Sequence, residues 1–349
     1  MPKKKDDSLS YKRAGVDIDA ANALKQGMRK DMETSDSRVL NRIGAFGSLF
    51  EASFPGIEHP VLVLKTEEPG TKQKIAVDHK RYSSICLDMI HHLINDIAVM
   101  GAVPLAVQDA IICGKLEPDV VAEMVRTMAE ACRNFDCTLT GGETSEQPGV
   151  IPEGTYILTS SVVGVVEKSM IIDGSRIQKG DQVLAVASNG LHTNGYSLVR
   201  KLMAERPSII DDNVNGESFL DAILTPHLCY LPGIKELFAL QELHGLAHIT
   251  GGGIGENLDR ILPADLDARI DLGKIDILPI FKLIHEAGNA SDATMLRTFN
   301  LGVGLTIVAD RKSVPLIESH LSKKGYVSYA IGEIVEGKKA VSFEGNLKW

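Results

Sequence analysis

Residues 83–102, SSICLDMIHHLINDIAVMGA, carry the clearest helix signal in the chain. At about 100° per residue, their apolar and polar side chains separate onto two sides of a helix. Gly101 and Pro104 then supply an ordinary helix end. The apolar side consists of Met89, Ile90, Leu93, Ile94, Ile97 and Ala98. The polar side consists of Asp88, His91, His92, Asn95 and Asp96.

The polar side of this helix has an uncommon composition for a surface. Solvent-facing sides usually carry Lys and Glu, whereas Asp, Asn and His are shorter and are weaker helix formers. The carboxylates of Asp88 and Asp96 and the amide of Asn95 suit hydrogen-bond anchors or ligands for a hard cation. A solvated face is the plainer alternative. His91 and His92, taken singly, are more often structural or solvent-facing than ligands.

Strands and helices alternate on both sides of this helix, which favours an α+β fold with strand-rich layers. Residues 169–190 resemble a new beginning, a turn followed by a buried strand, so we predict domains at 1–168 and 169–349. In the first half we expect strands at 59–67, 104–116, 137–142 and 156–168 and a helix at 117–136. The apolar run at 61–64 suits a strand buried on both faces. In the second half we expect helices at 195–203, 279–288 and 313–325 and strands at 300–310 and 327–337.

Composition narrows the classes of protein. The chain has 349 residues and a formal net charge of -9, which argues against nucleic acid or an anionic membrane as a general partner. The start MPKKKDDSLSYKRAG lacks the apolar segment of a signal peptide, and no apolar run reaches membrane-spanning length. The five cysteines form no CxxC pair, so neither a disulfide framework nor a zinc site is indicated. We expect a cytoplasmic protein whose cysteines are mostly reduced core residues.

The segment LTGGETSEQPG (139–149) places Glu143 beside a backbone without side chains at Gly141 and Gly142. Such loops hold a phosphate or a metal close to the main chain, although an ordinary tight turn explains them equally well. The segment KTEEPGTKQK (65–74) follows a strand and contains Glu67, a candidate for Mg²⁺, and Lys72, a candidate for phosphate. A charged hairpin turn is its alternative, and the chain has no Walker A pattern.

Two later segments join loops to helix starts. In SNGLHTNGYSLVRK (188–201), His192 lies between two Asn-Gly turns, where an imidazole can donate to an anion or carry a proton. In HITGGGIGENLDRIL (248–262), a strand runs into Thr250 and three glycines, and backbone N–H groups at such a turn form a phosphate cradle. A structural histidine and a plain tight turn are the respective alternatives.

In this order, these segments resemble the phosphoribosylformylglycinamidine cyclo-ligase (AIR synthetase) family of purine biosynthesis. The similarity extends over nearly the whole chain, and its specificity comes from the order and spacing of the motifs. The motifs are LSYKRAGVDIDAANAL, GAFGSLFE, LINDIAVMGA, GKLEPD, TGGETSEQPG, VGVVEKSMIIDGS, LHTNGYSLVRK, HITGGGIGENLDRIL and RTFNLGVG. Two related families fit less well. A hydrogenase-maturation relative would end in a cysteine, whereas this chain ends in NLKW. A selenophosphate synthetase would carry a reactive cysteine or selenocysteine near its start, whereas the first cysteine here is Cys86.

The resemblance implies a fold and a reaction. Two N-terminal domains of a homodimer would form a shared β-barrel flanked by helices, and the C-terminal domain would be mixed α/β. The enzyme would use ATP and Mg²⁺ to phosphorylate the formyl oxygen of formylglycinamidine ribonucleotide. A substrate nitrogen would then close the imidazole ring, releasing aminoimidazole ribonucleotide, ADP and phosphate.

The resemblance also implies roles for residues. Catalysis would fall to Asp96, His192 and Lys72, and Asn95 and Asp88 would support Asp96 as a metal ligand. The substrate phosphate would lie on Thr250, Gly251, Gly252 and Gly253. The implied ATP-binding residues are Gly44, Gly47, Asn95, Gly141, Gly142 and Glu143, and the implied metal ligands are Glu67, Asp96 and Glu143.

One departure bears on activity. The family usually reads T-D-G-V-G-T-K where this chain has Thr66-Glu67-Glu68-Pro69-Gly70-Thr71-Lys72. The segment LKQGMRK also differs from the family, and Arg29 or Lys30 could supply its positive charge. Two alternatives therefore stay open: an ATP-dependent enzyme of the same superfamily with another substrate, and a dimer that binds ATP without turnover.

Overall fold

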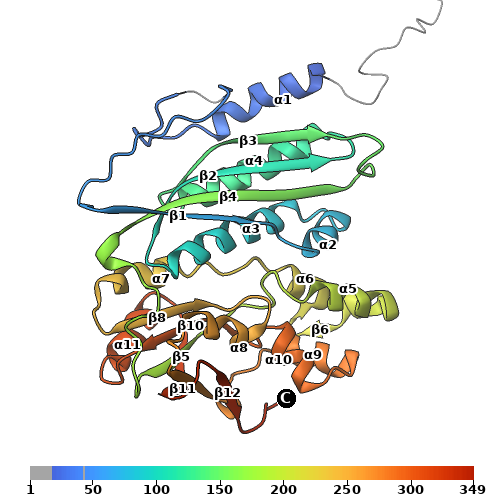
Figure 1. Ribbon diagram of the computed structural model, residues 1–349. Helices are drawn as coiled ribbons and strands as arrows, with labels where there is room; N and C mark the ends of the chain where they lie inside the picture. Colours follow the sequence, from blue (N-terminus) through green and yellow to red (C-terminus); the bar gives the residue numbers. More distant parts are fainter. Residues whose placement is uncertain (1–17, 42–43) are drawn as a thin grey trace, which may run out of the picture.

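Each half of the molecule is built around its own β-sheet, and the two halves lie one above the other (Figure 1). The computed structural model describes residues 18–41 and 44–349. The first nine residues of the motif LSYKRAGVDIDAANAL (9–24) lie outside the described residues, as does the side chain of Arg29. The mixture of strands and helices expected in both halves is confirmed.

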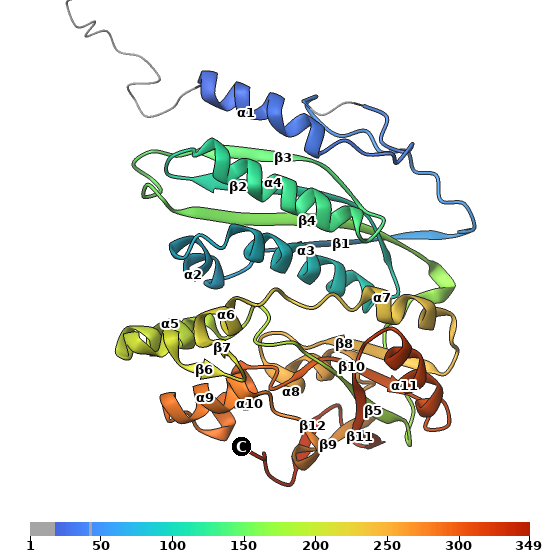
Figure 2. The same cartoon turned by 180° about the vertical axis from the view of Figure 1, so that it is seen from behind.

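The first half contains a four-stranded sheet in the order β1-β4-β2-β3, in which only β2 and β3 run parallel. Helices α3 and α4 cover one face of this sheet, behind the strands in Figure 1 and in front of them in Figure 2. Helix α1 packs against α4. The elements are α1 (Ile18–Asp31), β1 (Pro60–Glu67), α2 (Lys72–Asp78), α3 (Tyr82–Ala98), β2 (Val103–Cys113), α4 (Pro118–Arg133), β3 (Thr138–Glu146) and β4 (Tyr156–Glu167).

Helix α3 is the helix expected from the sequence, and its six apolar positions are all buried in the core. Strand β1 is also confirmed, but the expectation that both of its faces are buried is wrong. β1 is an edge strand whose residues alternate between exposed and half-buried positions. The face without helices leaves Leu62 52% and Leu64 71% exposed. An apolar run of four residues did not distinguish a central strand from an edge whose outer face is hydrophobic.

The second half contains a six-stranded sheet in the order β12-β9-β11-β5-β10-β8 and a small two-stranded sheet. The large sheet is antiparallel except for the pairing of β12 with β9. Its strands are β5 (Gln182–Ala187), β8 (Leu243–His248), β9 (Leu266–Asp271), β10 (Val303–Ala309), β11 (Ser328–Glu336) and β12 (Val341–Glu344). The small sheet is β6 (Asn213–Val214) with β7 (Glu217–Ser218). The helices are α5 (Tyr196–Glu205), α6 (Phe219–Leu224), α7 (Leu231–Ile234), α8 (Gly253–Leu258), α9 (Pro279–Gly288), α10 (Asp292–Thr298) and α11 (Val314–Lys323).

The five cysteines are buried and unpaired, as expected for core thiols. Within residues 18–41 and 44–349, no helix combines the length and apolarity needed to cross a bilayer. In the described part of the chain the first sheet is open, with β1 and β3 at its edges and no closed barrel.

Candidate active site

The polar side of α3 faces the second half of the molecule, where residues 224–230 run along it. The Asn95 Nδ2 donates to the Leu228 carbonyl at 2.8 Å, and the Asn95 Oδ1 accepts from the Tyr230 N–H at 2.7 Å. The Asp88 Oδ1 accepts from the His227 N–H at 2.7 Å. Asn95 was expected in an ATP site, but both ends of its buried amide are engaged in holding the two halves together.

Lys72 belongs to the same connection. It is the first residue of α2, and its Nζ donates to Asp88 Oδ1 at 2.9 Å and to the carbonyls of His192 at 3.0 Å and Thr225 at 2.9 Å. Lys72 and Asp88 are both fully buried. Burial lowers the pKa of Lys72, and the Asp88 charge opposes that shift. Because the three ammonium protons are committed inside the protein, the expected phosphate contact of Lys72 gives way to a positioning role.

A second, more open ion-pair cluster lies near the C-terminal end of α3. The Lys65 Nζ lies 2.9 Å from Glu67 Oε2 and 3.0 Å from Asp96 Oδ2. The other oxygen of Asp96, Oδ1, accepts from His248 Nδ1 at 2.7 Å. Burial alone would raise the pKa of Asp96, but the His248 hydrogen bond and the nearby positive charges hold it well below its usual range. Asp96 is therefore a carboxylate that both orients an imidazole and pairs with a lysine.

Four histidines lie behind this cluster. His248 Nε2 faces His227 Nε2 at 2.9 Å, and the rings of His227 and His192 stack with centroids 3.8 Å apart. Because the Asp96 carboxylate can only accept, His248 Nδ1 carries the proton of that hydrogen bond, and His248 Nε2 shares a second hydrogen bond with His227 Nε2. Burial lowers the pKa of His92 to about 4 and holds those of His192 and His227 well below their usual range. The rings of His92, His192 and His227 are therefore neutral at pH 7.

His192, expected to act on substrate or phosphate, is buried, and its Nε2 contacts Asn189 Oδ1 at 3.1 Å. Its ring supports His227 rather than reaching solvent. Sequence reasoning missed Lys65, His227 and His248. Lys65 could have been found, since strand positions two apart share a face and Glu67 was already a candidate. His248 lies two residues before the Thr250–Gly253 turn, whereas nothing near His227 indicated a role.

Glu143 does not join the carboxylates of Glu67 and Asp96. Across the first sheet, Glu67 pairs with Ser160, Ser160 with Asp109, and Asp109 with Gly142. Paired residues share a face and consecutive residues alternate, so Glu143 lies on the opposite face from Glu67. The two strands are also three spacings apart, roughly 14 Å at about 4.8 Å each. Within one chain, the expected metal set of Glu67, Asp96 and Glu143 is therefore divided.

Two glycine segments of the first half lie side by side. The Ser48 Oγ, next to Gly47, donates to the Thr140 carbonyl at 2.6 Å, which brings the exposed 44–47 segment next to Gly141. A side chain on Gly142 would collide with the carboxyl of Asp109, since its Cβ would lie 2.2 Å from Oδ1. Asp109 is buried, which raises its pKa to about 7, and sequence reasoning missed it.

The turn at Thr250–Gly253 is held by Asn257. The Asn257 Nδ2 donates to the carbonyls of Thr250 at 3.3 Å, Gly251 at 3.1 Å and Gly253 at 2.8 Å. Gly252 and Gly253 adopt φ of +94° and +64°, which side-chain-bearing residues rarely adopt. A Cβ on Gly251 would lie 3.2 Å from the Oδ1 of Asn194, so the turn adjoins the 192–195 loop.

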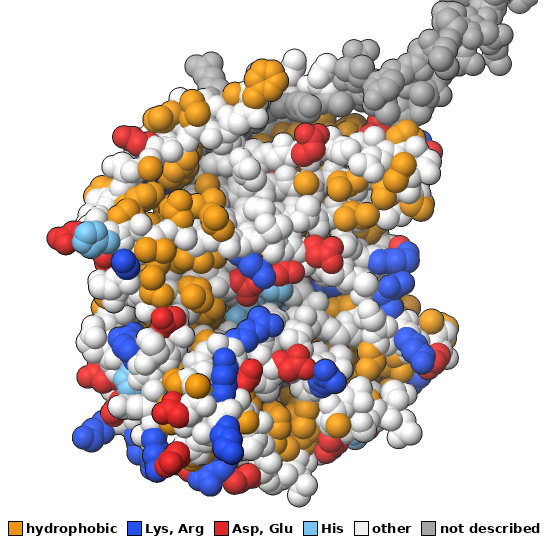
Figure 3. Space-filling model, in the orientation of Figure 1, with side chains coloured by type: hydrophobic (Ala, Val, Ile, Leu, Met, Phe, Trp, Pro, Cys, Tyr) orange, Lys and Arg blue, Asp and Glu red, His pale blue; other side chains and the backbone are white. Residues whose placement is uncertain are grey.

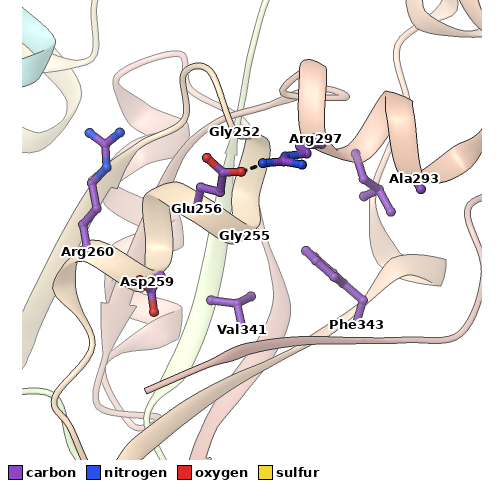
Figure 4. A pocket seen from close by; sticks show the side chains of 10 residues that line it. Gly252, Gly255, Glu256, Asp259, Arg260, Ala293, Arg297, Val341 and Phe343 are labelled. Carbon is purple, nitrogen blue, oxygen red and sulfur yellow. Dashed lines mark hydrogen bonds and ion pairs between the residues drawn. The ribbon is translucent and has the colours of Figure 1, made fainter. Parts of the chain in front are cut away.

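A cavity of about 730 Å³ opens beside this turn. Figure 4 shows Arg260 and Arg297 on opposite sides of Glu256, and the Arg297 Nε lies 2.9 Å from Glu256 Oε1. Of the four turn residues expected at a substrate phosphate, only Gly252 lines this cavity. The other lining residues are Gly255, Glu256, Asp259, Arg260, Ala293, Leu296, Arg297, Val341 and Phe343.

Comparison with known proteins identifies the family. Residues 57–166 match the N-terminal domain of AIR synthase related proteins, and residues 178–344 match their C-terminal domain. The phosphoribosylformylglycinamidine cyclo-ligase of Nitrosococcus oceani is 40% identical, covering 99% of this chain and 98% of that protein. The enzyme of the same name from Methylobacillus flagellatus is 42% identical over 94% of each chain.

Among solved structures, hydrogenase maturation protein HypE in complex with ATP has the same fold, with a TM-score of 0.65 at 14% identity over 93% of this chain and 91% of that one. The near-complete coverage by relatives of one name is the decisive finding. This chain belongs to the phosphoribosylformylglycinamidine cyclo-ligase family, within the AIR synthase related proteins.

Proposed function

We propose that this protein is an ATP-dependent phosphoribosylformylglycinamidine cyclo-ligase of purine biosynthesis. The observation that carries the proposal is 40% identity over 99% of the chain to a protein of that name. The enzyme converts formylglycinamidine ribonucleotide and ATP into aminoimidazole ribonucleotide, ADP and phosphate. Its substrates are soluble metabolites, in keeping with a cytoplasmic location.

The proposed architecture has an N-terminal ATP-binding and dimerisation domain at 1–168 and a C-terminal substrate domain at 169–349. A second copy would cover the open face of the first sheet, so that two sheets together form a barrel. The exposed Leu62 and Leu64 on this face support that occupant, because water-exposed apolar strands are a liability in a monomer. Figure 3, which views this face, shows hydrophobic side chains gathered over the N-terminal strands.

For ATP, we propose Gly141, Gly142 and Glu143, with Gly44 and Gly47 from the adjoining segment. The support for this site is that two consecutive glycines leave the backbone accessible to a nucleotide. A Cβ on Gly142 would collide with Asp109, and Gly141 adjoins Ser48. The exposed Glu143 carboxylate is the donor we propose for Mg²⁺ carried by the nucleotide. When bound, this ion neutralises charge on the triphosphate during phosphoryl transfer.

For the ribonucleotide phosphate, we propose the Thr250–Gly253 turn. Its backbone is bare at three positions, and Asn257 fixes its carbonyls from behind. Arg260 and Arg297 line the adjoining cavity, where Glu256 and Asp259 balance their charge. The 192–195 loop lies against Gly251 and connects this turn to the histidine cluster through His192.

For ring closure, we propose that His248 takes the proton released as the substrate nitrogen bonds to the formyl carbon. Asp96 fixes the ring through Nδ1, and His227 would have to release the Nε2 atom of His248 before that nitrogen could take the proton. His227 and His192 hold this nitrogen in place, and Lys72 acts indirectly by holding the His192 backbone. Asp96 and Lys72 are thus positioning residues in this scheme.

Steady-state turnover with Mg·ATP and formylglycinamidine ribonucleotide tests the proposal. We expect ADP release that depends on the ribonucleotide and is matched by aminoimidazole ribonucleotide. ADP release with a different partner compound, and none with formylglycinamidine ribonucleotide, would favour a related enzyme with another substrate. A rise in melting temperature with Mg·ATP but no ADP would favour the binding protein without turnover.

A further inference from the structure

Lys65, Glu67 and Asp96 are arranged like a cation-binding site in which the Lys65 ammonium lies at the position of the cation. Lys65 and Glu67 alternate with Leu64 and Thr66 on β1, so both point toward α3, which supplies Asp96. One oxygen from each carboxylate converges on the Lys65 Nζ, at 2.9 and 3.0 Å. Figure 3 shows acidic, basic and histidine side chains gathered at the seam between the two halves.

All four carboxylate oxygens have a donor. The Asp96 Oδ1 accepts from His248 and its Oδ2 from Lys65. The Glu67 Oε2 pairs with Lys65, and its Oε1 accepts from the Glu68 N–H at 3.2 Å. A magnesium ion needs near-octahedral oxygens at about 2.0–2.1 Å. To bind here it would have to displace an ammonium and take over oxygens that already have partners.

The positive charge of Lys65 also disfavours a divalent ion between the carboxylates of Glu67 and Asp96. The Lys65 Nζ lies 2.9 Å from Glu67 Oε2 and 3.0 Å from Asp96 Oδ2, so an ammonium already stands between the two carboxylates. A divalent ion between these carboxylates would therefore meet a fixed positive charge a few ångströms away.

We propose that the Lys65 ammonium is a built-in cation for Glu67 and Asp96, and that it takes the place a divalent metal ion would need between them. The expected role of these two residues as metal ligands does not fit the structure. The ion that accompanies ATP is then held without this pair. The proposal concerns cation binding only, so it stands or falls independently of ring closure.

Mn²⁺ binding, measured by electron paramagnetic resonance on nucleotide-free full-length protein, tests the proposal. Lys65→Met keeps the length of the side chain and removes the charge. We expect it to bind Mn²⁺ at least about tenfold more tightly than wild type, because a repelling charge is gone and two carboxylates remain. Adding Asp96→Asn to Lys65→Met should abolish the gain, and Lys65→Arg should show none.

Lys74→Met is the matched control, because Lys74 pairs with Asp78 at 2.9 Å on the exposed surface of α2. It should leave Mn²⁺ binding unchanged. Two results would overturn the proposal: a folded Lys65→Met that binds Mn²⁺ no better than Lys74→Met, or a tight Mn²⁺ site in wild type that Asp96→Asn removes. The second result needs no lysine variant, so the proposal stays testable if Lys65→Met fails to fold.

Discussion

Lys65 and Lys72 make the same kind of contact in two different settings. Each pairs with an aspartate on α3, Lys65 with Asp96 and Lys72 with Asp88, at nitrogen–oxygen distances of 3.0 and 2.8 Å. The side chain of Lys65 is 36% exposed and that of Lys72 is fully buried. In the closed setting the pair joins the two halves of the molecule. In the open setting it borders the histidines proposed to carry out chemistry.

The difference follows from solvation. A buried charge whose partner is removed has no water to replace it, so the Lys72–Asp88 pair is costly to break. At the open cluster, water can solvate whatever remains, so the Lys65 contacts are cheap to break. We therefore expect substitutions at the buried pair to change stability and substitutions at the open cluster to change function.

The largest expected effect is on turnover at the open cluster. Asp96→Asn removes the charge that fixes His248, and we expect kcat to fall roughly 10²–10⁴-fold, the range for loss of acid–base catalysis. Chemical denaturation should show a smaller stability loss than any variant of the buried pair. Wild-type kcat in Asp96→Asn would remove Asp96 and His248 from the proposed chemistry.

The next effect is on stability at the buried pair. Lys72→Ala leaves Asp88 buried without its counter-charge, and we expect the free energy of unfolding to fall by about 3–5 kcal/mol. Urea denaturation measures this, with Lys74→Ala as the surface control expected to change it by less than about 0.5 kcal/mol. The double variant Lys72→Met/Asp88→Leu removes both charges but leaves the His227 N–H and two backbone carbonyls unpaired, so it should recover only part of the loss. Equal effects of Lys72→Ala and Lys74→Ala would break the comparison.

Asp109 extends the comparison to a buried carboxyl without a counter-charge. No side-chain ion pair of the described residues includes it. Its pKa is raised from 3.8 to about 7, so between these values the folded state binds more protons than the unfolded state. Its contribution to stability is complete below about pH 4 and is lost as the pH rises through 7. Asp109→Asn removes the titration, so the variant should gain stability relative to wild type between pH 5 and 8.

The slope of that gain should not exceed about 1.4 kcal/mol per pH unit, the limit for one proton. Denaturation of both proteins at matched pH values gives the difference, from which the titrations of Asp88 and His92 cancel. A difference that stays constant over this range would mean that burial does not perturb Asp109.

The smallest expected effect is the stability change in Lys65→Met. Exposed and half-exposed ion pairs contribute less than about 1 kcal/mol, so the free energy of unfolding should stay within that margin. Urea denaturation beside Lys72→Ala gives a direct ratio of the two lysines. A loss at Lys65 as large as that at Lys72 would show that the open cluster also holds the fold together.

The composition of the polar side of α3 correctly predicted that this side is more than a solvated surface. The sequence did not show which of its residues join the two halves and which belong to the candidate active site. Asp88 and Asn95 anchor residues 224–230, whereas Asp96 faces Lys65 and His248. These partners lie up to 152 residues away in the chain, so helical periodicity carries no information about them.

Neighbouring residues in the sequence suggested two further roles, for Lys72 and for Glu67 with Glu143, that the structure does not support. Lys72 follows a glycine turn, which suggested a phosphate site, but it begins a short helix that points its ammonium inward. Glu67 and Glu143 are both acidic residues near glycines, and only the strand order and register place them on opposite faces of the sheet. The glycine turn at 250–253 was found because its signal is local, three consecutive glycines at a strand-to-helix junction.

Transfer of the formyl oxygen tests the cyclo-ligase assignment most directly. Substrate labelled with ¹⁸O at the formyl group is incubated with enzyme and Mg·ATP, and the released phosphate is analysed by mass spectrometry. The account predicts one ¹⁸O in the phosphate for each aminoimidazole ribonucleotide formed, since the formyl oxygen leaves with the phosphoryl group. Unlabelled phosphate, or ADP without the imidazole product, would contradict it.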